Sequence, residues 1–187
     1  MSVVDVAVAT HRLLTEQELT HGFGGALALN FYADPRSTAD VDVNVFVPWA
    51  EGLPLIGLFE SIGYLPVKPP AEALPVSGIR LAREGTRIVL DVFFSLDAVY
   101  DEVAERLQWF PFGYDGEELP FFSAEDVVVF KLSFNRDKDW VDIRHLLEHQ
   151  RTIELDYIER QLLAMRGPSM HPRVARVRAM ARTAGIV

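Results

Sequence analysis

The sequence predicts an α+β fold, in which a small mixed or antiparallel sheet is flanked by helices and followed by a C-terminal helical bundle. Residues 40–47 read Asp-Val-Asp-Val-Asn-Val-Phe-Val, and this alternation has the period of two that is typical of a strand. Apolar residues recur at helical spacing near the N-terminus and again over residues 124–184. Strand-like segments thus precede residue 122 and helical ones follow it, a segregation typical of α+β chains.

The chain is predicted to begin with two helices. Apolar residues at near-helical spacing indicate the first helix at residues 3–19. The second is expected to begin at Gly25 and to end before Pro35, because proline does not continue a helix. The strand at residues 40–47 follows, and its odd-numbered positions place four valines on one face.

The remaining elements of the mixed region are predicted from periodicity and from turn residues. They are, in order, a helix at 50–63, a proline-rich loop at 66–75, a hairpin of strands at 79–83 and 87–94, a helix at 96–107 and a second hairpin within 109–122.

The last third of the chain is predicted to be entirely helical. Ser123 is a suitable N-cap for its first helix, with Asp126 in the third position of a capping box. Apolar spacing indicates helices at 124–134, 138–149, 154–165 and 172–184. We therefore expect a mixed α/β core at residues 1–122 and a helical region at residues 123–187.

Length and composition indicate an ordinary globular protein. Of its 187 residues, 49% are hydrophobic and 24% charged, and a chain of this length buries enough surface to fold without a disulfide or a structural metal. Cysteine is absent, which excludes disulfides, zinc-thiolate sites and thiol nucleophiles. With neither a signal-peptide pattern nor about 18 uninterrupted apolar residues, we expect a cytoplasmic protein that does not enter a membrane.

The charged residues are distributed unevenly. The net charge is −9, yet residues 160–187 contain six arginines and no acidic residue. The rest of the chain therefore carries 12 basic and 27 acidic groups. Such asymmetry can mark a binding site for a polyanion, or it can belong to the solvated face of a helix.

Asp40 and Asp42 are the first candidate functional residues. They lie two apart on the predicted strand, so their side chains project from the same face, opposite the valines. Two neighbouring carboxylates repel each other unless a cation lies between them. Mg²⁺ suits this arrangement because it binds one or two carboxylates together with substrate phosphates. The alternative is a solvent-facing edge of an amphipathic strand.

Asp91 interrupts the apolar run of residues 88–94, where a charge without a partner would be costly to bury. A strand beside the first one would bring Asp91 to the Asp pair, and three carboxylates could hold two metal ions. The alternative is an ion pair with one of three arginines, Arg36, Arg80 or Arg87.

Candidate phosphate-binding residues precede the Asp pair. Gly24 and Gly25 begin a predicted helix, where backbone N–H groups and a close backbone approach favour a phosphate. Arg36 and Thr38 follow, and Arg36 could form a fork to a phosphate or to an internal carboxylate. Neither a Gly-x-x-x-x-Gly-Lys-Ser/Thr phosphate loop nor a Gly-x-Ser-x-Gly hydrolase motif is present.

These motifs resemble a known superfamily. Residues 22–29 followed by residues 36–42 resemble the glycine-pair-to-Asp-x-Asp signature of the polymerase-β-like nucleotidyltransferases, although many relatives have Gly-Ser where this chain has Gly24-Gly25. Downstream, residues 126–131 and 136–143 are similar to the AbiEii family, which includes toxins of type IV toxin–antitoxin systems and MenT-type tRNA-modifying toxins.

The resemblance implies an enzyme that transfers a nucleoside monophosphate from an NTP to an acceptor hydroxyl. It also implies a role for each matching residue. Gly24 and Gly25 would contact the phosphates, Asp40 and Asp42 would hold Mg²⁺ or Mn²⁺, Asp91 would be the third carboxylate, Lys131 would contact the triphosphate, and Asp139 or Asp142 would complete the site. Alternatively, Lys131 could extend to water, and Asp139 and Asp142 could pair with neighbouring basic residues.

The acceptor stays open at this point. The toxin resemblance and the arginine-rich C-terminal segment favour tRNA as the acceptor and a cognate antitoxin as a partner. A small-molecule acceptor, as in antibiotic nucleotidyltransferases, is the first alternative and would predict further acids facing a cationic substrate. A catalytically silent domain that binds a nucleotide or a partner protein is the second.

Overall fold

The computed structural model describes residues 1–75 and 78–186, which group into two compact units. The first unit comprises residues 1–27 and 37–121. The second comprises residues 28–36 and 122–187. The short helix α2 (Gly25–Leu29) therefore begins in one unit and ends in the other.

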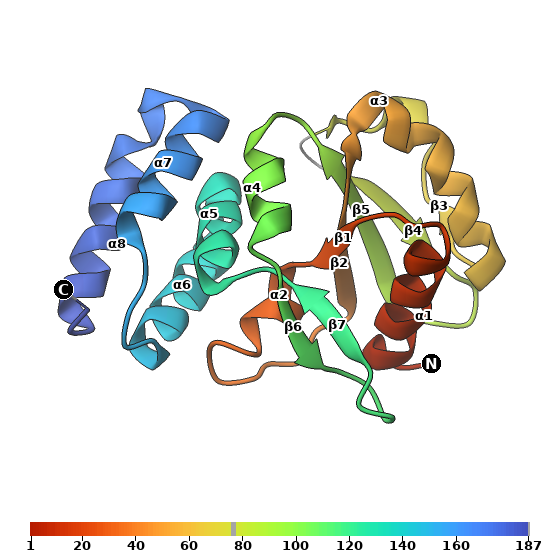
Figure 1. Cartoon of the computed structure of the whole chain (residues 1–187), viewed down its shortest axis with the longest axis horizontal. Coiled ribbons are helices and arrows are strands. Elements are labelled where there is room, and N and C mark those ends of the chain that lie inside the picture. The colour runs from red at the N-terminus through yellow and green to blue at the C-terminus, as the bar shows by residue number, and fades with distance from the viewer. Residues whose placement is uncertain (76–77, 187) are drawn as a thin grey trace. The chain divides into compact units, whose positions relative to one another are not determined.

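The first unit holds the whole sheet (Figure 1). Its elements run along the chain as α1 (Val3–Glu16), β1 (His21–Phe23), β2 (Asp40–Pro48), α3 (Trp49–Gly52), the 3₁₀ helix η1 (Leu53–Ile62), β3 (Leu65–Pro66), η2 (Pro70–Glu72), β4 (Ile79–Ala82), β5 (Val89–Ser95), α4 (Val99–Glu105), β6 (Gln108–Pro111) and β7 (Glu118–Phe121). The predicted α+β class is thus confirmed, with strands first and a helical region last.

The strands of the described residues form one seven-stranded mixed sheet in the order β3-β4-β5-β2-β1-β7-β6. At its centre β2 pairs in parallel with β5 and antiparallel with β1. On the other side of β5, the strand β4 pairs antiparallel, as the predicted hairpin requires. The register sets Asp42 beside Asp91, and Asp91 beside Arg80 of β4.

The core of the first unit confirms the valine face of β2. Val41, Val43 and Val45 are at most 1% exposed, and α1 packs against this strand and against η1. Full burial of each such side chain stabilises the folded state by about 1.5–3 kcal/mol. The face that carries Asp40 and Asp42 is opposite, so burial of the valines fixes the direction of both carboxylates.

Three predicted helices differ from those observed. The segment at residues 50–63 is mostly 3₁₀ helix, and Pro54 lies at its start, where the missing N–H of proline costs no helical bond. The helix predicted at 96–107 is shorter, α4 at Val99–Glu105. α2 spans only five residues, which limits its dipole.

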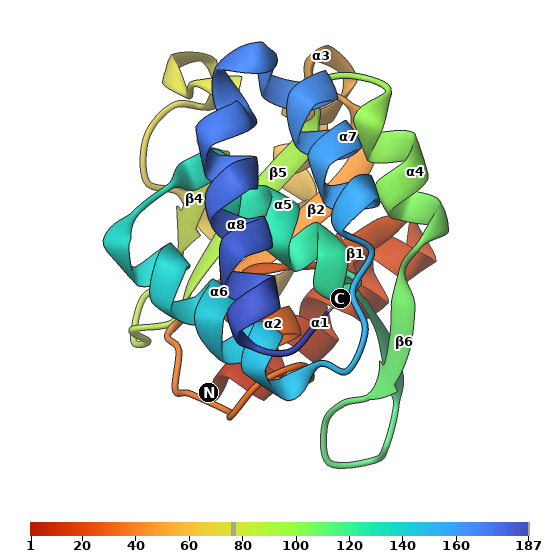
Figure 2. The same ribbon diagram turned by 90° about the vertical axis from the view of Figure 1, so that its left-hand side faces the viewer.

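The second unit contains α5 (Ala124–Phe134), α6 (Asp137–His149), α7 (Leu155–Arg166), the 3₁₀ turn η4 (Pro168–Met170) and α8 (His171–Thr183). Figure 2 labels its four α-helices. α5 packs on α6 and α7, and α8 packs on the same two helices. This is the helical bundle that the apolar spacing predicts. None of the described helices is both long and apolar enough to cross a membrane.

Residues 28–36 belong to the second unit through two hydrogen bonds to the main chain. The Tyr32 hydroxyl donates to the Phe122 carbonyl at 2.8 Å. Gln150 Nε2 donates to the Tyr32 carbonyl at 2.9 Å. No local pattern could predict this grouping, because the partners lie 90 and 118 residues apart.

Ser123 caps α5 as predicted, and its Oγ accepts from the Asp126 N–H at 3.1 Å. Asp126 does not complete the reciprocal half of a capping box. Its buried carboxylate accepts from the Tyr157 hydroxyl at 2.6 Å and from the Ser123 hydroxyl. The carboxylate therefore links the start of α5 to α7.

Candidate active site

The first unit gathers acidic side chains on one face of its sheet. Asp40 and Asp42 project from the same face of β2, as the period-two pattern predicts. β5 sets Asp91 directly beside Asp42, so these carboxylates lie on adjacent strands. We refer to Asp40, Asp42 and Asp91 as the acid face.

Gly25 lies against the acid face. A Cβ built on Gly25 would lie 1.8 Å from Asp42 Oδ2, and the Gly25 φ of +59° is itself disfavoured for other residues. The Gly24 N–H donates to the Asp42 carbonyl at 3.0 Å. The Gly24 N–H, which the sequence suggested as a phosphate donor, is therefore bonded within the sheet. Glycine is needed at residue 25 because the Asp42 carboxylate occupies the space of a side chain.

Arg80 holds Asp91 in a bidentate ion pair. Arg80 Nε donates to Asp91 Oδ1 at 2.8 Å and Nη2 donates to Oδ2 at 2.6 Å. The Asp91 hydrogen bond raises the pKa of Arg80 above its ordinary value, and the charges of Asp91, Asp40 and Asp42 add to this against the opposing effect of burial. Of the three arginines that the sequence offered as partners, the structure selects Arg80.

The acid face fits a divalent cation at the Asp pair better than at all three carboxylates. Among the described residues, no group of three or more His, Asp or Glu side chains is arranged to hold a metal ion. Two carboxylates completed by substrate phosphates suit Mg²⁺. Asp40 and Asp42 would hold the ion, while both oxygens of Asp91 already accept hydrogen bonds from Arg80.

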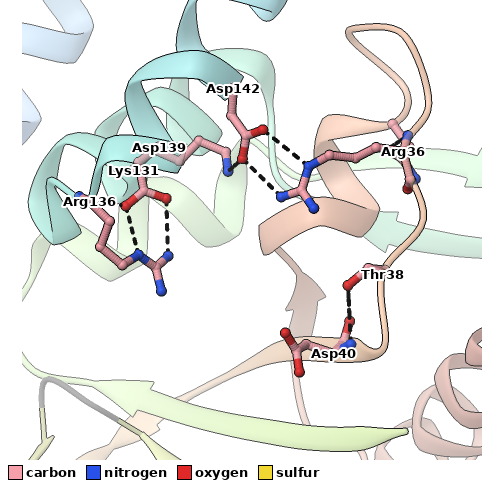
Figure 3. Close-up of polar contacts among 8 residues, drawn as sticks. Arg36, Thr38, Asp40, Lys131, Arg136, Asp139 and Asp142 are labelled. Atoms are coloured by element: carbon pink, nitrogen blue, oxygen red, sulfur yellow. Dashed lines mark hydrogen bonds and ion pairs between the residues drawn. The ribbon is translucent and has the colours of Figure 1, made fainter.

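Two further residues of the first unit bear on the site. Thr38 Oγ1 accepts from the Asp40 N–H at 3.1 Å and donates to the Asp40 carbonyl at 3.2 Å, so this hydroxyl orders the start of β2 (Figure 3). Asn44 follows Asp42 on the same face of β2 and is 5% exposed, and its Nδ2 has no hydrogen-bond partner within the described part of the chain. Asn44 is not among the functional residues predicted from the sequence, although its even-numbered position places it on the strand face of Asp40 and Asp42.

In the second unit, Asp142 binds two cations. Lys131 Nζ donates to Asp142 Oδ2 at 2.6 Å, and Arg36 donates to both carboxylate oxygens at 3.1 and 2.9 Å (Figure 3). Burial acts to raise the pKa of Asp142, but the hydrogen bonds from Arg36 and Lys131 outweigh it and lower the pKa. Lys131 is buried, so the alternative that it extends to water is wrong.

Asp139 forms a separate cluster at the start of α6. Its carboxylate accepts from the Arg136 N–H at 2.9 Å, from Arg136 Nε at 2.8 Å and from Nη2 at 3.0 Å (Figure 3). The side chain is 1% exposed. The contacts of Asp139 are those of a helix cap, whereas Asp142, one turn later, pairs with Lys131 and Arg36.

Comparison with known proteins supports the fold. No protein-family model and no curated protein sequence matches the chain. The solution structure of the antibiotic-resistance factor ANT(2'')-Ia is 16% identical, with a TM-score of 0.61 over 94% of this chain and 98% of that one. The crystal structure of ANT(2'')-Ia with adenylyl-2''-tobramycin is 18% identical, with a TM-score of 0.55 over 96% and 97% of the two chains.

A third solved structure extends the similarity. An antigenic nucleotidyltransferase-like protein from Paracoccidioides brasiliensis is 16% identical, with a TM-score of 0.53 over 93% of this chain and 90% of that one. Identity at this level establishes the fold alone. The chain has a nucleotidyltransferase-like fold along nearly its whole length.

Proposed function

We propose that this protein is a metal-dependent nucleotidyltransferase that moves a nucleoside monophosphate from an NTP to an acceptor hydroxyl and releases pyrophosphate. The observation that carries the proposal is the Asp pair. Asp40 and Asp42 share one face of the central strand, and Asp42 lies against the glycine that begins α2, within a nucleotidyltransferase-like fold.

In this proposal each part of the first unit has a defined task. Asp40 and Asp42 bind Mg²⁺ or Mn²⁺, which when bound neutralises charge on the triphosphate. Gly25 leaves room for Asp42 to hold its orientation. Asp91 orients the acceptor hydroxyl, and Arg80 holds Asp91 in position.

Lys131 is the proposed phosphate contact of the second unit. An ammonium group has three donors, and its hydrogen bond to Asp142 uses one of them. Asp142 and Arg36 are then positioning groups for Lys131. We assign no nucleotide contact to Thr38 or Asp139, because the hydroxyl of the former and the carboxylate of the latter are used to order β2 and α6.

For the acceptor we favour a small molecule. A cavity of about 430 Å³ lies beside Asp91 in the first unit, within the size range of small-molecule sites. Val67, Leu74 and Ile79 give it apolar walls, and its charged lining is Glu72 and Asp91 with Lys68 and Arg80. Likewise, one ANT(2'')-Ia structure contains a small-molecule product, adenylyl-2''-tobramycin.

Transfer to tRNA, with an antitoxin as partner in the setting that the AbiEii resemblance implies, is the second candidate. The arginines of residues 160–187 are the observation that favours it. Much of that charge is used internally, however: Arg178 pairs with Glu159 at 2.6 Å, and Arg173 donates to the Leu132 carbonyl at 2.6 Å.

A labelling experiment tests the proposal and separates the acceptors. The protein is incubated with Mg²⁺ and each of four α-³²P-labelled NTPs, with either total tRNA or a set of hydroxyl-bearing antibiotics that includes tobramycin. Asp42→Asn should abolish labelling, whereas Asp101→Asn, which removes an exposed carboxylate in α4, should not. Label on an antibiotic supports the favoured acceptor, and label on RNA supports the second. Absence of label from both, together with no metal-dependent NTP binding, would overturn the proposal.

A further inference from the structure

Three strands of the first unit carry a row of charged residues across the sheet. Arg80 of β4 is in register with Asp91 of β5, and Asp91 is in register with Asp42 of β2. Residues that face each other across adjacent strands project from the same side of the sheet. The row therefore places the permanent positive charge of Arg80 on the acid face, next to Asp91.

The contact between Arg80 and Asp91 engages both carboxylate oxygens, and each oxygen keeps a second lone pair. Both Asp91 oxygens accept from the guanidinium, at 2.8 and 2.6 Å, which is the bidentate geometry of the strongest protein ion pairs. The Asp91 side chain is 12% exposed, whereas the Arg80 side chain is 56% exposed, so the pair lies at the surface with its carboxylate turned inward. A metal ion on the remaining lone pairs would lie close to the Arg80 guanidinium, and the repulsion between the two positive charges opposes its binding.

The charges of the site also favour a single ion. Without a bound nucleotide, the three carboxylates carry a charge of −3, and one divalent cation together with the Arg80 guanidinium balances it. A second divalent cation would leave an excess of positive charge next to an arginine that is not deprotonated in proteins.

We propose that Arg80 takes the place of a second metal ion, so that the acid face binds one divalent cation, at Asp40 and Asp42, while Asp91 stays with Arg80. Arg80 is thus a positioning residue. Its positive charge keeps a metal ion away from Asp91, while the second lone pair of each Asp91 oxygen can still accept a hydrogen bond from the acceptor hydroxyl. This inference rests on the proposed function, because it requires the Asp pair to bind a metal.

Direct titration with Mn²⁺, followed by the electron paramagnetic resonance signal of the free ion, tests the inference without turnover. The wild-type protein should bind one Mn²⁺ per chain. Arg80→Gln should bind two, because the positive charge next to Asp91 is removed, and the double variant Arg80→Gln/Asp91→Asn should return to one. Arg80→Lys, which keeps a cation at Asp91, should remain at one.

Arg87→Gln is the matched control, since it removes an exposed arginine from the turn before β5. It should leave the count at one, and circular dichroism should report the same helix content in every variant. Two ions on the wild type, or one ion on Arg80→Gln, would overturn the inference about Arg80 alone. No ion on the wild type would overturn the metal role of Asp40 and Asp42, and the inference with it.

Discussion

At the scale of single residues, the site depends on one close approach. Asp42 and Gly25 are 17 residues apart in the chain, and the carboxylate of one fills the position where the other would carry a Cβ. The sequence predicts a glycine pair near the Asp pair, but not that Gly25 acts by leaving space for Asp42. That distinction requires the fold.

Gly25→Ala should therefore disturb the site itself. The new Cβ would meet Asp42 Oδ2 at 1.8 Å, and alanine at a φ of +59° is strained by about 1–2 kcal/mol. We expect loss of Mn²⁺ binding, measured by titration. Gly85→Ala is the matched control, because Gly85 has a φ of +78° and no atom within 4 Å of a built Cβ. Equal Mn²⁺ binding by the two variants would contradict the steric explanation.

Two buried histidines of the first unit make its stability dependent on pH. His21 Nδ1 lies 2.7 Å from the Leu19 carbonyl, which can only accept, so Nδ1 carries the proton. His21 Nε2 then accepts from His11 Nδ1 at 2.9 Å, and both rings are neutral. Burial is the main cause that lowers the pKa of His21 to about 4.

The sign of the pH dependence follows from that lowered pKa. Between pH 6.5 and about pH 4 the unfolded chain binds a proton at His21 that the folded chain does not. Stability should be fully present above pH 6.5 and fall as the pH decreases through this range, by about 3 kcal/mol at most. Urea unfolding at several pH values measures this change in the free energy of unfolding. His21→Phe should flatten the dependence, whereas His145→Gln, an exposed histidine, should not.

At the scale of elements, strong sequence periodicity was sufficient to predict a helix or strand, and weak periodicity was not. β2 and α5 lie where the sequence predicts them, because β2 alternates strictly and α5 has a serine N-cap before an apolar run. η1 was misjudged, since a 3₁₀ helix shares the apolar content of an α-helix. Sequence also placed Asp91 on a strand but could not choose its partner, which depends on the pairing of β4 with β5.

The start of α6 offers a test of structural against functional roles. Asp139→Asn removes the charge that accepts three hydrogen bonds from Arg136, and should cost about 1–2 kcal/mol of stability. NTP binding should be unchanged. Asp137→Asn, an exposed acid in the same helical turn, should cost less. Thermal unfolding and nucleotide titration measure the two effects, and loss of NTP affinity with stability intact would restore a nucleotide role for Asp139.

The buried pair that links α5 and α6 should be more sensitive. Asp142→Ala leaves Lys131 without its carboxylate, a loss of about 3–5 kcal/mol for a buried ion pair. The double variant Lys131→Met/Asp142→Leu removes both charges and should recover part of that stability. Denaturant unfolding of the two variants compares them. A double variant less stable than Asp142→Ala would contradict this account.

At the scale of the whole molecule, the uneven charge has a structural explanation. Arginines of the C-terminal segment bind groups within the second unit: Arg160 lies over Tyr157, Arg166 donates to Ser133 Oγ, Arg173 donates to the Leu132 and Ser133 carbonyls, Arg176 lies over Trp140, and Arg178 pairs with Asp156 and Glu159. Composition reveals the excess of arginine, whereas only the packing of the helices reveals how it is used.

Arg173→Ala should consequently lower stability rather than RNA affinity. Its guanidinium donates to the carbonyls that end α5, so the variant should lose about 1–3 kcal/mol. Arg182→Ala removes an exposed arginine from the same helix and is the control. Thermal unfolding and a tRNA gel shift at low salt measure both variants. Loss of tRNA binding by Arg173→Ala with unchanged stability would favour the tRNA acceptor.

The assignment of residues 28–36 to the helical unit has a consequence for synthesis on the ribosome. This segment is made early, but its Tyr32 carbonyl is bound by Gln150, which is translated 118 residues later. At bacterial or eukaryotic elongation rates that gap corresponds to a delay on the order of 10 s. During this time the segment leaves the ribosome without its native neighbours. A gene fragment that encodes residues 122–187 alone would lack it altogether, so this helical unit cannot be exchanged between proteins as one continuous piece.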